Sequence, residues 1–190
     1  MIAAKSILLS ASSARTAVPV HAVTPDTLAT LVKSLSVVQK AWIEANGFEA
    51  KPNSHLCVAD KQGGLAMVLY GIGTAETVDP FEPGALSCAL PAGDYALASG
   101  FSHPDLAALG WILHSYEFTR YLSGKENSRS RRRARLVCPD NVDRTNLLAR
   151  ADAVMLGRDL INTPAEDMGP SQLETAMRSL ARQFKAAVSV

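Results

Sequence analysis

The stretch GRDLINTPAEDMGP, residues 157–170, contains a stop signal and a start signal for helices. Pro164 cannot donate a backbone hydrogen bond, and it pushes Thr163 away from helical geometry. Gly169 can cap a helix, and Pro170 suits the first helical position. The stretch therefore predicts one helix that ends near residue 162 and a second helix that begins at residue 170.

Helical periodicity continues on both sides of this junction. Residues 141–161 place apolar side chains at helical spacing, at Leu147, Leu148, Ala151, Val154, Met155 and Leu160. After the junction, an apolar stripe is formed by Leu173, Met177, Leu180 and Phe184. The last residues, AAVSV at 186–190, suggest the opening of a buried strand, and a strand needs neighbours to pair with. The junction thus predicts the start of a second domain, with the apolar stripe exposed in this chain.

Strands and helices alternate through the first 140 residues. Helices are expected from Thr24 to Gly47, as one helix or two, at 84–90 and at 102–122. Strands are expected near Lys5, at 55–60, 65–73, 94–100 and 134–140, with a Gly-Gly turn between the second and third. This order predicts an α/β fold with three layers, a mixed sheet flanked by helices. The predicted parts are an α/β domain at 1–140, a linker helix at 141–164 and the start of another domain at 165–190.

Composition excludes several classes of protein. The chain has 190 residues, of which 47% are hydrophobic, and its formal net charge is +1. No apolar run approaches the roughly 18–20 residues of a membrane helix, so no membrane partner is expected. After Lys5, the first 15 residues hold a run of only three apolar residues, Ile7 to Leu9, which is too short for a signal peptide and indicates a cytoplasmic protein. Cys57, Cys88 and Cys138 are expected to be buried thiols without disulfides.

Titratable residues give no local active site. The four histidines lack metal-ligand spacing; they are His21, His55, His103 and His114. Two close acidic pairs are expected to serve as helix caps, Asp140 with Asp143 and Glu166 with Asp167. No catalytic, cofactor-binding or metal-binding residue is therefore assigned.

Two further segments allow a structural and a functional interpretation. GIGT, residues 71–74, follows a strand as a phosphate-binding loop would, but a lone G-x-G is more typical of a turn. Residues 120–135 hold seven of the 19 basic residues, including Arg129, Arg131, Arg132, Arg133 and Arg135. A solvated loop is the favoured interpretation of this segment. A docking patch for a neighbouring subunit or for nucleic acid is the alternative.

Two segments resemble the leucyl (cytosol) aminopeptidase family. These are GRDLINTPAEDMGPSQLE and LGWILHSYEFTRYLSGK, which together cover roughly residues 105–190, whereas residues 1–100 are similar in layout only. The resemblance implies a macro-domain-like N-terminal domain and a C-terminal metallopeptidase domain. It further implies two divalent metals, zinc or manganese, peptide substrates and a hexamer. The family's ligand runs, Val-Gly-Lys-Gly and Asn-Thr-Asp-Ala-Glu-Gly-Arg, do not occur in these residues.

The sequence therefore predicts the N-terminal region of a metal-dependent aminopeptidase. This region is expected to be accessory, serving assembly or access to the site, and to be inactive and without tightly bound metal on its own. The alternative is a free-standing module, either a macro-like nucleotide-binding domain or an Arg-loop domain for nucleic acid.

Overall fold

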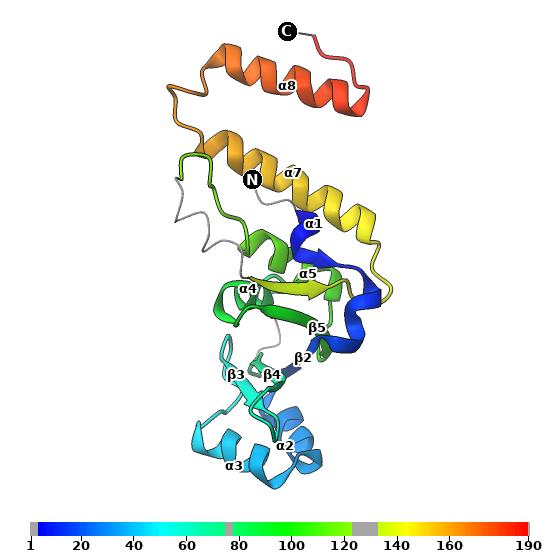
Figure 1. The fold of residues 1–190 in the computed structure, drawn as a ribbon, viewed down its shortest axis with the longest axis vertical. Helices are drawn as coiled ribbons and strands as arrows, with labels where there is room; N and C mark the ends of the chain where they lie inside the picture. The colour runs from blue at the N-terminus through cyan, green and yellow to red at the C-terminus, as the bar shows by residue number, and fades with distance from the viewer. Residues whose placement is uncertain (1–3, 75–77, 123–132, 190) are drawn as a thin grey trace.

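The computed structural model describes residues 4–74, 78–122 and 133–189. Its centre is a six-stranded sheet in the order β1-β6-β5-β2-β4-β3 (Figure 1). The strands are β1 Leu8–Leu9, β2 Val18–Val23, β3 His55–Ala59, β4 Leu65–Gly71, β5 Gly93–Ser99 and β6 Ala134–Val137. All neighbours pair in parallel except β3 and β4, which form an antiparallel hairpin across the predicted Gly-Gly turn. The expected mixed sheet is confirmed.

Helices cover both faces of this sheet. Successive residues of β4 point to opposite sides, so Val68 and Tyr70 join one buried cluster while Leu69 joins another. The smaller cluster contains Leu28 of α2 (Pro25–Ser34) and Ile43 of α3 (Val37–Ala45). The larger cluster contains residues of α1 (Ala4–Ile7), α4 (Leu86–Ala89), α5 (Pro104–His114) and α7 (Arg144–Asn162). The predicted three-layer α/β architecture is therefore confirmed.

The first helical region is divided into two helices by its capping residues. Thr24 and Thr27 form a capping box at the start of α2, as expected from Thr24-Pro25-Asp26. Ser36 and Gln39 form a second capping box at the start of α3, so the chain leaves the helical conformation at Leu35 and re-enters it after Ser36. Gly47 follows α3 with a positive φ of 57°, as expected from Asn46-Gly47.

Helix α5 is shorter than the sequence pattern predicts. It ends at His114, whereas the pattern suggested a helix to residue 122. The hydroxyl of Ser115 donates to the Ile112 carbonyl at 2.7 Å, and the Arg133 guanidinium donates to the Ser115 carbonyl. These bonds satisfy the end of the helix, and residues 116–122 then continue without regular structure.

Two glycines allow α5 to contact the short 3₁₀ helix η2 (Glu82–Ala85) at backbone distance. A Cβ atom on Gly110 would lie 2.6 Å from the Phe81 carbonyl oxygen, and one on Gly84 would overlap the Gly110 backbone. Both glycines are buried. A side chain at either position would therefore separate η2 from α5.

The N-terminal segment forms the edge of the sheet beside β6. The predicted first strand is only two residues long, because α1 occupies Ala4–Ile7, and a 3₁₀ helix, η1 (Ala11–Thr16), leads on to β2. Leu8 pairs with Leu136 of β6, and Arg144 of α7 donates to the Leu8 carbonyl at 2.9 Å. The edge strand is thus held on one side by β6 and at its end by α7.

Helices α7 and α8 (Pro170–Phe184) follow the predicted boundaries closely. They lie at the end of the molecule opposite α2 and α3 (Figure 1). The α8 stripe is exposed, by 43% at Leu173, 52% at Met177, 39% at Leu180 and 70% at Phe184. Residues 186–189 have no regular structure, which differs from the expected strand, and Lys185 ends the helix in a left-handed conformation. None of the helices in the described part of the chain is long and apolar enough to span a membrane.

Candidate functional site

The two segments that resemble the aminopeptidase family contact each other at the end of α7. The Tyr116 hydroxyl donates to Oδ1 of Asp159 at 2.8 Å and accepts from Nδ2 of Asn162 at 3.1 Å. The Arg158 guanidinium donates to the Leu113 carbonyl at 2.6 Å, and its Cζ lies 5.5 Å from the centre of the Tyr116 ring. Burial is the main cause that raises the pKa of Tyr116.

A second group of bonds extends this contact to the junction itself. Arg120 Nη1 lies 3.4 Å from the Thr163 hydroxyl, which donates to the Asp159 carbonyl at 2.7 Å. The Tyr121 hydroxyl donates to Oδ2 of Asp167 at 2.5 Å, and this bond raises the pKa of Tyr121. Residues 116–121 therefore bind both the end of α7 and the turn that leads to α8.

A groove lies between α7, α8 and the segment after α5. It has a volume of about 360 Å³, and its lining includes Phe118, Leu156, Leu160, Met168 and Ala176. Four polar side chains also line it, those of Thr119, Arg120, Asp159 and Thr163. The groove is thus an apolar surface with one cation and one carboxylate.

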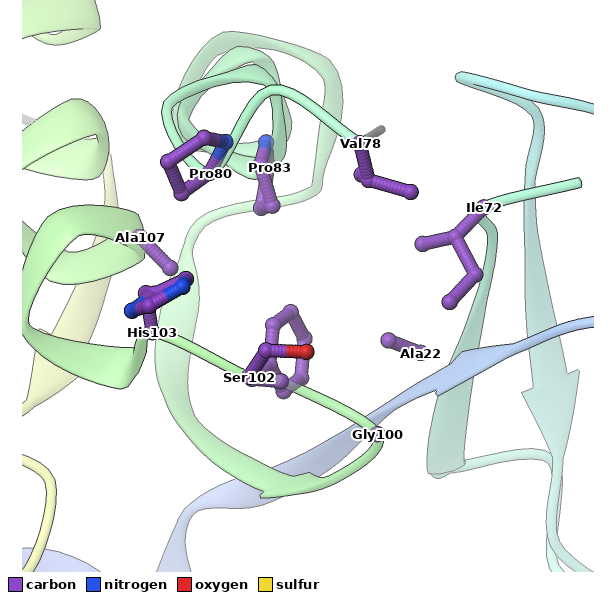
Figure 2. A pocket seen from close by; sticks show the side chains of 10 residues that line it. Ala22, Ile72, Val78, Pro80, Pro83, Gly100, Ser102, His103 and Ala107 are labelled. Atoms are coloured by element: carbon purple, nitrogen blue, oxygen red, sulfur yellow. The ribbon is translucent and has the colours of Figure 1, made fainter. Parts of the chain in front are cut away.

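A separate crevice lies where β2, β4 and β5 end (Figure 2). Parallel α/β sheets bind ligands at such carboxyl ends, at the point where successive connections leave in opposite directions. The crevice volume is only about 60 Å³, and its polar side chains are Ser102 and His103. It has room for a few water molecules but not for a nucleotide.

The glycines of GIGT are explained by packing beside this crevice. A Cβ atom on Gly71 would overlap the Lys51 carbonyl, and Gly71 exchanges backbone hydrogen bonds with the 50–54 loop. Gly73 has a φ of 65° and lies against the ring of Pro52. Both glycines allow β4 to approach the 50–54 loop, which supports the interpretation as a turn.

The histidines lie apart from one another. His21 Nδ1 lies 2.8 Å from the Ser99 hydroxyl, and burial lowers the pKa of His21. His114 Nδ1 lies 3.0 Å from the Gly110 carbonyl oxygen, His103 precedes α5, and His55 begins the edge strand β3. In the described ranges, no three residues of the His, Cys, Asp and Glu types converge as a metal site would require.

The acidic pairs are not all helix caps. Asp143 caps α7 as expected, accepting from the backbone N–H groups of Thr145 and Asn146 at 2.9 and 3.1 Å. Asp167 instead accepts from Tyr121, and α8 is preceded by Gly169 without a side-chain cap. The expectation that Asp167 serves as a cap is therefore corrected.

The cysteines also differ from the expectation of three buried thiols. Cys138 is buried and Cys57 is half-buried, and burial raises the pKa of both thiols. Cys88 is exposed, because the short helix α4 carries it on its outer side while Leu86 faces the core. All three are free cysteines.

The arginine-rich segment is only partly within the described residues. Arg129, Arg131 and Arg132 lie outside them. The Arg133 side chain is 18% exposed and contacts Glu117 and the Ser115 carbonyl, while Arg135 pairs with Asp94 at 2.7 Å. These two arginines hold β6 to its surroundings, so the solvated-loop interpretation does not apply to them.

Sequence reasoning missed the residues that join the two family-like segments. The sequence pattern places Tyr116 within the expected helix at 102–122 and Arg120 at the start of the basic segment 120–135. The signal that could have found these residues is a set of polar groups within the expected helix at 102–122. The set consists of two tyrosine hydroxyls and one guanidinium. Polar groups on a helix face that is expected to be buried need partners, and here the partners lie 43 to 46 residues further along the chain.

Comparison with known proteins gives one family and several related structures. Residues 18–139 match the model of the M17 aminopeptidase N-terminal domain. The solved cytosol aminopeptidase from Coxiella burnetii is 29% identical with a TM-score of 0.85, covering 97% of this chain and 39% of that chain. The bottromycin maturation enzyme BotP (20% identity, TM-score 0.63, covering 89% and 38%) and tomato leucine aminopeptidase (17%, 0.63, 90% and 40%) share the fold.

The chain thus spans about two fifths of the length of these solved proteins. No curated protein matches the sequence. The family match covers well over half of the chain, and the fold agrees with it along nearly the whole length. The chain therefore belongs to the M17 aminopeptidase family, with residues 18–139 matching that family's N-terminal domain.

Proposed function

We propose that this chain is the N-terminal region of a leucyl-type, metal-dependent aminopeptidase. Residues 1–140 are the accessory α/β domain, 141–164 the linker helix and 165–190 the start of the peptidase domain. The family match and the 39% coverage of the Coxiella burnetii enzyme support this assignment. One solved BotP structure is a complex with manganese, which supports a metal requirement for the parent enzyme, with manganese or zinc as candidates.

The single structural observation that carries the proposal is the exposed stripe of α8. Leu173, Met177, Leu180 and Phe184 are 39% to 70% exposed on one amphipathic helix that follows the junction. Contiguous exposed apolar residues mark a surface that another domain or protein covers. The peptidase domain is the proposed partner, and α7 with its Tyr116 contacts fixes the direction in which α8 leaves the α/β domain.

The accessory role proposed for this region is assembly of a hexamer or control of access to the peptidase site. Peptides are the proposed substrates, reached through the peptidase domain. The cytoplasm is the proposed location, on the strength of the similarity to a protein described as a cytosol aminopeptidase.

The test compares this chain with the product of the complete reading frame. The 190-residue chain should release no product from leucyl-anilide substrates, with or without added zinc or manganese. The longer product should release it in a metal-dependent and chelator-sensitive way, because two-metal hydrolysis needs several convergent ligands around two cations. Chelator-sensitive activity of the short chain, or a reading frame that stops at Val190, would refute the proposal.

A matched pair of variants tests the role of α8. Met177→Glu places a charge in the stripe, whereas Arg178→Gln alters only an exposed helix position that pairs with Glu174. In the longer protein, Met177→Glu should reduce soluble yield and activity at least tenfold, and Arg178→Gln should leave both unchanged. Equal behaviour of the two variants would show that the stripe is not an interdomain surface.

A further inference from the structure

The groove between α7 and α8 combines an apolar lining with two opposite charges. Leu156 and Leu160 lie on α7, Ala176 lies on α8, and Met168 lies on the turn between them. All four are half-buried, so each presents part of its apolar surface to the groove. The groove volume of about 360 Å³ lies within the range of small-molecule sites.

Arg120 supplies the positive charge of this groove. Its guanidinium lies 3.4 Å from the Thr163 hydroxyl and 5.7 Å from the centre of the Tyr121 ring. No carboxylate of the described residues lies within ion-pair distance of it. The nearby Asp167 carboxylate is engaged by the Tyr121 hydroxyl. Arg120 therefore retains donors that suit a carboxylate ligand.

Asp159 supplies the negative charge of this groove. Its Oδ1 accepts from the Tyr116 hydroxyl, and no described residue donates to its Oδ2. Thr163 contacts both partners, because its hydroxyl accepts from Arg120 and donates to the Asp159 carbonyl. The bond to Asp159 reaches its backbone carbonyl, and both charged side chains line the groove.

We propose that this groove binds a free α-amino acid with an apolar side chain. The ligand carboxylate pairs with Arg120, the ligand ammonium pairs with Oδ2 of Asp159, and the side chain lies against Leu156, Leu160 and Met168. An α-amino acid carries an ammonium and a carboxylate on one carbon, which suits a groove whose lining holds one carboxylate and one cation. The choice of leucine as the ligand rests on the proposed aminopeptidase function, since such an enzyme releases free amino acids.

The test is a titration of the isotope-labelled 190-residue chain with leucine, followed by amide chemical shifts. Saturable shifts are expected at Thr163, Met168 and Ala176, with a Kd of about 1 mM, as suits a ligand of this size. N-acetyl-leucine lacks the ammonium and leucinamide lacks the carboxylate, so each should bind at least tenfold more weakly. Glycine, which lacks the apolar side chain, should also bind at least tenfold more weakly.

Variants of the chain provide the second arm. Arg120→Gln and Asp159→Asn should each weaken leucine binding at least tenfold, and the asparagine still offers an acceptor to Tyr116. Arg178→Gln removes an exposed cation of α8 outside the groove lining and should bind leucine normally. The amide spectrum of each variant also reports whether the fold is retained.

Several results would overturn the proposal. These are an absence of saturable shifts, binding of N-acetyl-leucine or leucinamide as tight as that of leucine, or normal leucine binding by the Arg120 and Asp159 variants. The same leucine titration on the product of the complete reading frame must also show binding. If the longer protein did not bind leucine, the rest of the polypeptide would fill the groove and the proposal would be overturned. None of these measurements uses peptidase activity, so failure of the binding site and failure of the proposed function are distinguishable.

Discussion

Gly110→Ala should destabilise the chain although alanine is the better helix former. In a helix interior, alanine is favoured over glycine by about 1 kcal/mol. At Gly110, however, the new Cβ would lie 2.6 Å from the Phe81 carbonyl oxygen, about 0.8 Å closer than ordinary contact allows. The obstacle is backbone, so it cannot rotate away, and overpacking of this kind costs about 1–3 kcal/mol. After the gain in helix propensity is subtracted, we expect a net loss of up to about 2 kcal/mol in the free energy of unfolding.

Gly157→Ala in α7 is the matched control. Both substitutions replace a glycine inside a helix, but a Cβ at Gly157 meets no atom within 4 Å. The control should therefore stabilise the chain by about 0.5–1 kcal/mol. Urea unfolding followed by circular dichroism measures both values on the same scale. If Gly110→Ala raised stability as much as Gly157→Ala does, the proposed close contact between η2 and α5 would be refuted.

Three further changes test other contacts. Asp143→Ala should lower the free energy of unfolding by about 1 kcal/mol in urea titrations, because α7 loses its N-cap. Burial lowers the pKa of His21, so below about pH 6.5 the unfolded chain binds more protons than the folded chain. The free energy of unfolding should therefore fall as the pH drops through the lowered pKa of His21. Urea titrations across pH should show this fall, and His21→Gln should flatten it. Arg133→Ser should lower the free energy of unfolding by about 1–2 kcal/mol, because its side chain is mostly buried. Arg135→Ser should lower it by less than about 1 kcal/mol in the same assay, because its ion pair with Asp94 is half-exposed. Equal losses would show that burial does not set the contributions of these two arginines.

Local signals predicted most element boundaries. Thr24-Pro25, Asn46-Gly47 and Gly169-Pro170 each carry the chemistry of a helix end within two residues, so tertiary structure was not needed to place them. The Gly-Gly turn between β3 and β4 is equally local, because Gly63 has the positive φ that the turn requires.

Several of the differences depend on distant partners. Helix α5 ends at His114 because Ser115 and Arg133 satisfy its carboxyl end, and Arg133 lies 18 residues further along the chain. The two-residue strand β1 exists only because β6 lies beside it. The groove combines Arg120 and Asp159, which no spacing rule connects. Such contacts depend on the packing of the whole fold, which periodicity does not specify.

The pairing of β1 with β6 also affects how the chain folds during synthesis. The Leu8 carbonyl receives its bond from Arg144, 136 residues later in the sequence. At about 5–20 residues per second, the ribosome needs roughly 7–27 s to add that length. The first strand to be made is therefore the last to be placed, and until then the apolar N-terminal segment has no sheet to join. Chaperone contacts on a nascent chain of this protein should concentrate on residues 4–9 and disappear once α7 has emerged.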